Sequence, residues 1–395
     1  MLIKSIYGGW VDRMLQSEEA ARRLGVKVAT LYAYVSRGLL ESHPEPNGRR
    51  RLFDLADIER LAKRRRGGRE VETRLATVTT GVTQLREDGP AYRGRPAVEL
   101  ARRMSFEQVA EMLWQSDANA VAPTDWTAPD HGPCPLIETA DRFSWTLVMC
   151  GAADPLRADA RPESIHRSAR RIIAALVDSV GHRAAGDDRT GPIADRLAGR
   201  LVGRESSLSA TAMNAALILM ADHELATSTL AVRVAASVRA DIYDALLAGL
   251  ATMAGPLHGG ASQHAYELLV AAERDGAARA LNDALRSQRH PPGFGHLVYT
   301  GGDPRFDALL PLVEPLLSEE RRQLLRQIMD LADANQVGPC NSDLALAALS
   351  WGTGMPSDAG RTIFTLARIA GWTAHYQEEL TERPLRFRAR AVYSV

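Results

Sequence analysis

At 395 residues, the chain is longer than one hydrophobic core usually serves, so we expect two or more domains. Hydrophobic residues make up 45% and charged residues 24%, and the formal net charge is zero, which is ordinary for a soluble globular protein. No apolar run is long enough for a membrane span, and the N-terminus lacks the basic and apolar succession of a signal peptide. These features argue against a membrane protein, and we expect a cytoplasmic one.

The three cysteines give no sign of a metal or disulfide framework. Cys134, Cys150 and Cys340 are odd in number, widely separated and without metal-ligand spacing. We therefore expect reduced thiols and no metal site.

Charge is unevenly distributed along the chain. Between Val11 and Glu70, fourteen Lys and Arg residues face nine Asp and Glu residues, an excess of five positive charges. This stretch ends in a polar, glycine-containing run from Lys63 to Arg69, which is typical of a boundary. We expect a small module over residues 1–70 and a larger one over 71–395.

Two short helices are predicted in the small module. Ser17 can cap the first, acidic residues favour its N-terminal end, and Gly25 ends it. The second covers residues 28–38, with Val28, Leu31 and Val35 at helical spacing on one face. The side chains expected to face outward are Lys27, Thr30, Tyr34 and Arg37.

This helix, tight turn and helix resemble the winged helix-turn-helix of the MerR-like DNA-binding family. Pro46-Asn47-Gly48 would turn a hairpin whose second strand carries Arg49, Arg50 and Arg51. The resemblance implies weak DNA binding, with these arginines on phosphates and Tyr34 at a groove edge. The alternative is a module that only assists assembly or is a vestigial DNA-binding unit.

The larger module is predicted to be all-α. From about Ala97 the sequence is rich in Ala and Leu, with Gly or Pro at the interruptions. Residues 106–113 and 172–177 each show an apolar helix face. Neither a Gly-x-Gly-x-x-Gly motif after a strand nor a Gly-Lys-Ser/Thr phosphate loop is present, so a Rossmann site or a P-loop is not expected.

Three loop motifs interrupt the helical pattern and carry candidate chemistry. His258 and His296 are each bracketed by glycines, which let the backbone approach a ligand closely. The third motif, Pro339-Cys340-Asn341-Ser342-Asp343, supplies a carboxylate. A carboxylate can take a proton from a carbon next to a carbonyl while neutral imidazoles hydrogen-bond the developing enolate. The set therefore suits carbon-acid chemistry.

These motifs, in this order, resemble the citrate synthase family over about residues 75–395. The matching segments are 221–225 (Ala-Asp-His-Glu-Leu), 255–261, 293–305, 341–343 and 368–372 (Arg-Ile-Ala-Gly-Trp). The resemblance implies a large and a small helical domain closing over a cleft, the small one at roughly residues 255–350. It also implies homodimers in which each site borrows a residue from the partner.

The resemblance assigns a role to each candidate residue. Asp343 would remove the methyl proton of acetyl-coenzyme A, His258 would stabilise the enol, and His296 would polarise the ketone of oxaloacetate. The dicarboxylate would be held by His223, Arg305, Arg368 and, across the dimer, Arg388, although Arg386 lies only two residues away. Coenzyme A would contact Gly293, Phe294, Gly295 and Asn341. No tightly bound cofactor is implied.

Three departures from the family pattern concern the substrate. Ala226 and Ser262 stand where many relatives have Asn, and Leu297 stands where many have Arg. A 2-methylcitrate synthase that uses propionyl-coenzyme A stays open as an alternative, since one methylene changes pocket selectivity by only about 1–3 kcal/mol. A metabolite-sensing DNA-binding regulator is a second alternative. A sensor would need no proton-abstracting carboxylate, which favours an enzyme.

Overall fold

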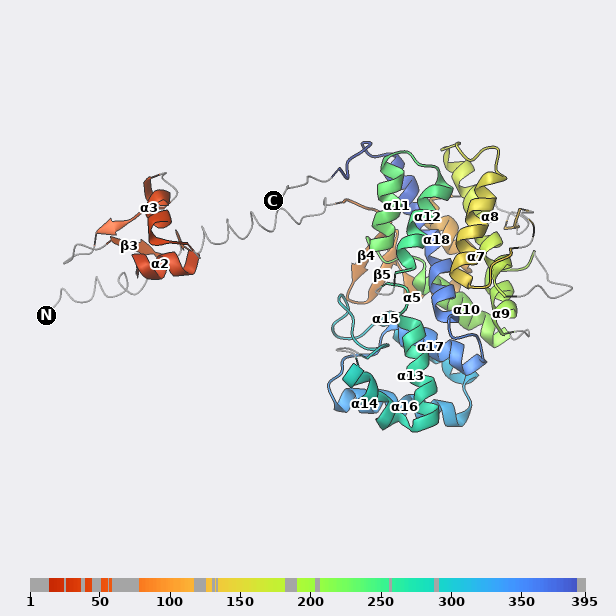
Figure 1. Cartoon of the computed structure of the whole chain (residues 1–395). Coiled ribbons are helices and arrows are strands. Elements are labelled where there is room, and N and C mark those ends of the chain that lie inside the picture. Colours follow the sequence, from red (N-terminus) through yellow and green to blue (C-terminus); the bar gives the residue numbers. More distant parts are fainter. Residues whose placement is uncertain are drawn as a thin grey trace. The chain divides into compact units, whose positions relative to one another are not determined.

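The computed structural model separates the chain into two units, Met1–Val78 and Thr79–Val395 (Figure 1). It describes residues 14–24, 26–36, 40–44, 51–55, 57–58, 78–116, 126–129, 132, 134–181, 190–202, 207–255, 258–287 and 291–388. Each unit is considered by itself.

The N-terminal unit combines two helices with a small antiparallel sheet. Its elements are β1 (Met14–Gln16), α2 (Ser17–Leu24), α3 (Val28–Ser36), β2 (His43–Pro44) and β3 (Arg51–Asp54). The strand order is β1-β3-β2, with Leu15 opposite Phe53 and His43 opposite Leu52. Ala20, Leu31, Phe53 and Ile58 form the buried centre. The two predicted helices are present.

The side chains predicted to face outward around α3 differ in exposure, and Thr30 is half-buried. Lys27 is exposed, but Tyr34 is half-buried and packs against the apolar cluster of this unit. Tyr32 is the more exposed aromatic ring, with 43% of its surface accessible. Arg51 lies at the start of β3, whereas Arg37, Arg49 and Arg50 lie outside the described residues.

The second unit begins with a three-stranded antiparallel sheet and two helices. The strands are β4 (Thr83–Arg86), β5 (Gly89–Tyr92) and β6 (Arg95–Pro96), with Gln84 opposite Ala91. They lead into α5 (Ala97–Arg103) and α6 (Phe106–Trp114). Ser105 and Gln108 form a reciprocal capping box that fixes the start of α6.

A layer of long helices forms the larger part of this unit. It comprises α7 (Thr139–Ala152), α8 (Pro162–Ser179), α9 (Ile193–Val202), α10 (Ser207–Met220), α11 (Thr227–Ser237) and α12 (Ile242–Met253). Among these, α11 packs on α12, α7 on both α8 and α12, and α9 on α10.

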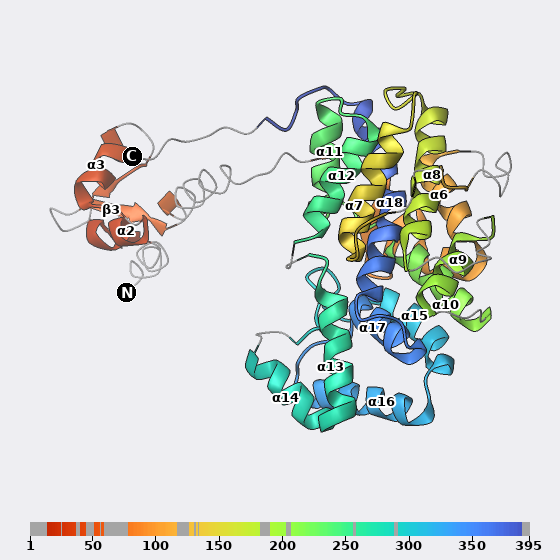
Figure 2. The same ribbon diagram turned by 45° about the vertical axis from the view of Figure 1, so that its right-hand side comes forward.

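The remaining helices form a second group at the other end of the unit (Figures 1 and 2). They are α13 (Ala261–Asp275), α14 (Ala277–Ser287), α15 (Pro304–Val313), the 3-10 turn η3 (Glu314–Leu316), α16 (Glu319–Ala334) and α17 (Ser342–Thr353). α13, α14 and α16 pack on one another, and α17 packs on α13 and α15.

The last helix, α18 (Ala359–Leu380), runs through the centre and contacts α6, α8, α10, α11, α12, α13 and α17. It is buried around most of its circumference, as expected of a helix enclosed by others. The all-α class predicted for the larger module is confirmed. Among the described residues, no helix combines the length and apolarity needed to cross a membrane.

Candidate active site

Six of the predicted site residues line a single cavity of about 170 Å³. They are His223, His258, His296, Arg305, Asp343 and Arg368. Five of them lie in loops or at helix starts and Arg368 lies in α18, and more than a hundred residues of sequence separate the first from the last. Ala226, Gly259, Ser262, Ser342 and Phe364 complete the lining.

Asp343 is placed by the N-terminal cap of α17. The Asn341 side chain accepts a hydrogen bond from the Asp343 N–H at 3.0 Å and donates to the Gly295 carbonyl at 2.8 Å. The Asn341 N–H donates to the Gly293 carbonyl at 3.0 Å, and Phe294 forms a β-bridge with Cys340. Residues 293–295 and 341 thus join the second histidine loop to the carboxylate.

Gly293 must be glycine at this junction. Its φ is +89°, and a Cβ would lie 3.0 Å from Leu344 Cβ. A side chain here would push α17, and with it Asp343, away from the loop.

Burial is the main electrostatic influence on Asp343. It raises the pKa of this carboxyl to about 6, with Asp303 adding to the rise and Arg305 opposing it. Such a group is largely ionised at neutral pH and is more basic than an ordinary aspartate.

His296 is held in one tautomer by its own loop. Nδ1 accepts hydrogen bonds from the N–H groups of Val298 (3.0 Å) and Tyr299 (3.1 Å). Burial and the Arg305 charge lower its pKa, so the ring is neutral and carries its proton on Nε2. This nitrogen lies 3.2 Å from Arg305 Nη2; both atoms then carry hydrogens, so they do not hydrogen-bond to each other and both can donate to a ligand oxygen.

His258 has a similarly fixed environment. Nε2 lies 2.8 Å from Ser228 Oγ at the start of α11. Burial and the charge of Arg368 lower its pKa, which favours the neutral ring. If the Ser228 hydroxyl donates to Nε2, the ring proton is on Nδ1.

Arg305 is anchored by a buried carboxylate. The residue is 3% exposed, and Asp303 accepts hydrogen bonds from its Nε–H at 2.9 Å and its Nη2–H at 2.8 Å. Burial opposes the charge, but Asp303 raises the pKa of Arg305, so the guanidinium is permanent. Asp303 also accepts from the Ser342 N–H at 2.9 Å, joining Arg305 to the loop of Asp343.

Arg368 and His223 bring unpaired donors or acceptors to the cavity. Arg368 is 1% exposed and donates from Nε to the Met220 carbonyl at 3.1 Å. Within the part of the chain that the structure describes, Arg368 Nη1 and His223 Nε2 are buried without a partner. Burial and the charges of Arg305 and Arg368 strongly lower the pKa of His223, which is therefore neutral. Unpaired buried polar atoms beside two guanidinium groups fit an anionic ligand with several oxygens.

Comparison with protein-family models identifies the family of this chain. The model "Citrate synthase, C-terminal domain" matches residues 71–390. The chain belongs to the citrate synthase family. A second model, "Helix-turn-helix domain", matches residues 14–66.

Individual members of the citrate synthase family align along most of the chain. Citrate synthase 2 of Bacillus subtilis is 28% identical, over 81% of this chain and 94% of its own. 2-Methylcitrate synthase 1 of Corynebacterium glutamicum is 26% identical, over 74% of this chain and 86% of its own. Among solved structures, the citrate synthase of Thermoplasma acidophilum, in ternary complex with carboxymethyl coenzyme A and oxaloacetate, is 22% identical. It superposes with a TM-score of 0.70 over 83% of this chain and 96% of its own.

Arg388, the arginine predicted to complete the site of a second citrate synthase subunit, lies outside the cavity of its own chain. Arg388 is exposed at the end of the described chain, where its N–H donates to the Leu385 carbonyl. Arg386 is paired with Glu379 of its own subunit through Nε (2.7 Å) and Nη2 (2.5 Å). Of the two, Arg388 is therefore the one that is exposed and without an ion-pair partner among the described residues.

The three departures from the citrate synthase pattern occupy different environments. Ala226 lines the cavity as the N-cap residue of α11, without a side chain able to cap it. Ser262 is buried in the cavity wall. Leu297, beside His296, is 101% exposed and lies outside the lining.

Sequence reasoning did not assign roles to Ser228 and Asp303, which hold His258 and Arg305. Asp303 could have been found from its N-cap position immediately before Pro304, a common start of a helix. Ser228 carries no such signal, because it lies in a helix thirty residues from His258.

Proposed function

We propose that this chain condenses acetyl-coenzyme A with oxaloacetate, giving citrate and free coenzyme A. The observation that carries the proposal is one cavity that combines a carboxylate of raised pKa, three neutral histidines and two buried guanidinium groups. The cavity is matched to a carbon acid and a dicarboxylate together.

The first step is proton abstraction from the acetyl methyl group. Asp343 is the base, since its pKa of about 6 leaves it ionised at neutral pH but a better proton acceptor than an ordinary aspartate. His258 donates from Nδ1 to the thioester oxygen, where negative charge develops. Ser228 fixes the ring for this role.

The enol carbon then attacks the ketone carbon of oxaloacetate. His296 donates its Nε2 proton to the ketone oxygen, while Arg305, Arg368 and His223 hold the two carboxylates. Water hydrolyses the citryl thioester. The oxaloacetate and coenzyme A analogue in the complex of the Thermoplasma acidophilum relative support this choice of ligands.

One experiment tests the reaction and also identifies the preferred acyl donor. Thiol release is measured on purified protein with oxaloacetate and either acetyl- or propionyl-coenzyme A. A preference for the propionyl donor would assign the chain to the 2-methylcitrate branch, to which several relatives belong. Absence of oxaloacetate-dependent release with either donor, in folded protein, would refute the proposal.

Two variants separate chemistry from binding. Asp343→Asn keeps the shape but cannot accept the proton, so kcat should fall by about 10³-fold or more while oxaloacetate still binds. Arg305→Ala removes a carboxylate partner, so the KM for oxaloacetate should rise steeply. Full activity in Asp343→Asn would show that the base is misassigned.

For the N-terminal unit we propose weak binding to double-stranded DNA. The helix-turn-helix match and the excess of positive charge between Val11 and Glu70 support it. Of the basic residues predicted to contact DNA, Lys27 and Arg51 are described and exposed, and Arg51 Nη1 donates to Ser42.

A further inference from the structure

The turn that presents His223 is held in an unfavourable backbone conformation. Glu224, the next residue, has a φ of +55°, a region that residues other than glycine seldom adopt. Asp222 is fully buried, and its Oδ2 accepts the Glu224 N–H at 3.1 Å. The Asp222 carboxylate therefore stabilises the turn.

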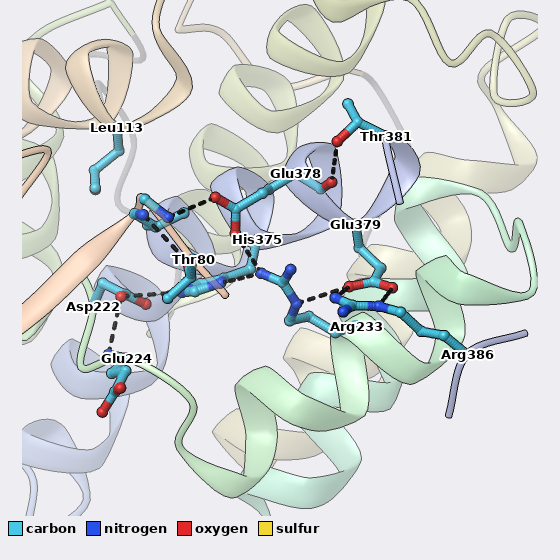
Figure 3. Close-up of polar contacts among 12 residues, drawn as sticks. Thr80, Leu113, Asp222, Glu224, Arg233, His375, Glu378, Glu379, Thr381 and Arg386 are labelled. Atoms are coloured by element: carbon cyan, nitrogen blue, oxygen red, sulfur yellow. Dashed lines mark hydrogen bonds and ion pairs between the residues drawn. The ribbon is translucent and has the colours of Figure 1, made fainter. Parts of the chain in front are cut away.

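A chain of buried polar contacts runs from this carboxylate through α18 to α11 (Figure 3). His375 Nε2 lies 3.2 Å from Asp222 Oδ2, and His375 Nδ1 lies 2.8 Å from Arg233 Nη1. A guanidinium can only donate, so Nδ1 must accept. The ring proton must then be on Nε2, where it points at Asp222.

Arg233 is itself fixed in place. It is fully buried, and it donates from Nε to Glu379 at 2.9 Å and from Nη1 to Glu378 at 2.7 Å. Glu379 is also held by Arg386, and Glu378 accepts the Gly81 N–H at 2.8 Å. The two arginines thus face the two glutamates, and His375 links this group to Asp222.

The hydrogen bonds run in one direction, from Arg233 through His375 to Asp222. We propose that His375, whose tautomer is set by Arg233, is a positioning residue for oxaloacetate. It holds the Asp222 carboxylate, Asp222 holds the turn at Glu224, and the turn directs His223 into the cavity. The inference rests on the proposed function, because oxaloacetate is the ligand that His223 would contact.

The test compares two replacements of His375 in the full chain. A glutamine side chain can still donate to Asp222 and accept from Arg233, so His375→Gln should keep the KM for oxaloacetate within about threefold of the parent. His375→Met has similar volume but no polar atom for either partner. It should raise that KM by about tenfold or more, with kcat changed far less.

A matched control separates positioning from general destabilisation. Arg196→Met breaks another buried ion pair, Arg196 Nη2 to Asp178 at 2.8 Å between α9 and α8, that has no contact with the cavity. It should lower the melting temperature without moving the KM. If His375→Met behaves like Arg196→Met, with the KM for oxaloacetate unchanged, the proposal is overturned.

A second readout does not depend on catalysis. The ¹⁵N chemical shifts of the His375 ring should show a proton on Nε2 and none on Nδ1, and a proton on Nδ1 would overturn the proposal. If the parent protein shows this tautomer but no thiol release and no oxaloacetate binding, the proposed reaction fails. The positioning of His223 for oxaloacetate then fails with it, while the buried relay itself is retained.

Discussion

At the scale of single residues, burial acts in opposite directions on the two kinds of titratable group in the cavity. It raises the pKa of Asp343 and lowers those of His223, His258 and His296. The carboxylate becomes a stronger base and the imidazoles stay neutral donors, so one environment suits both to their proposed roles.

The first prediction concerns pH. Proton abstraction needs ionised Asp343, so kcat/KM should fall as pH decreases through about 6, the pKa of this group in the folded protein. The measurement is the initial rate of thiol release from pH 5 to pH 8 at low acyl donor concentration. A profile that is flat down to pH 5 would contradict the assignment of Asp343 as the base.

The second prediction concerns the missing cap of α11. Ala226 occupies the N-cap position with extended backbone but no side-chain acceptor. Ala226→Asn should stabilise the folded protein by about 1 kcal/mol, because the amide oxygen can accept from the first turn. Thermal unfolding checks this, with Ala226→Leu as the variant that cannot cap. Equal melting temperatures for the two variants would contradict it.

At the scale of elements, α18 is where the cavity and the buried relay meet. Arg368 contributes to the cavity and donates to the Met220 carbonyl, Gly371 packs on Ala221 and Asp222, and His375 reaches Asp222. Spacings of three and four residues place successive side chains on one helix face, so all three lie on the side of α18 that contacts residues 220–222, where the turn of His223 begins.

The third prediction follows from the close approach of that turn to α18. A Cβ on Gly371 would lie 2.3 Å from Asp222 Oδ1 and 2.5 Å from the Ala221 carbonyl oxygen. Gly371→Ala should therefore displace the turn, lower the melting temperature and raise the KM for oxaloacetate. Gly199→Ala in α9 is the control, because its Cβ meets nothing within 4 Å and alanine favours a helix. If both variants behave alike, the contact does not constrain the turn.

Much of this element-level picture could be predicted from the sequence, but not all of it. Helix spacing and caps predicted α2 and α3, and glycine-flanked histidines predicted the loops that reach the cavity. The contacts that join Asp222, His375 and Arg233 carry no sequence signal, because they span 153 and 142 positions of sequence. The burial of Tyr34 was missed for a similar reason: its neighbours come from other elements of the N-terminal unit.

At the scale of the whole molecule, the guanidinium groups of the cavity already have carboxylate partners before any ligand binds. Arg305 faces Asp303, Arg368 is close enough to Asp222 to feel its charge, and Asp343 adds a further negative charge. Another guanidinium would strengthen the binding of a dicarboxylate. Arg388, exposed at the end of the described chain, is our candidate for that group in a partner subunit.

The fourth prediction tests this sharing of sites. Mixing Arg388→Ala protein with Asp343→Asn protein should restore activity, because each heterodimer would hold one site with both an intact base and a donated arginine. With random exchange, about a quarter of the parent activity is expected. No recovery under proven subunit exchange, or a monomer by sedimentation, would count against shared sites.

The fifth prediction concerns the N-terminal unit. The whole chain should bind duplex DNA more tightly than a chain starting near Glu70, and the difference should shrink as salt increases, because the contacts are mainly to phosphates. Fluorescence anisotropy at low and moderate salt provides the measurement. Equal binding by the two chains at low salt would assign the unit to assembly instead.

The exposed position of Arg388 also has a consequence for how the protein behaves on dilution. If the site is complete only when a second copy supplies this side chain, the rate per chain is not a constant. It should fall once the protein concentration drops below the dissociation constant of the dimer, and oxaloacetate, by bridging to the donated arginine, should oppose that fall. Substrate supply would then regulate association as well as turnover.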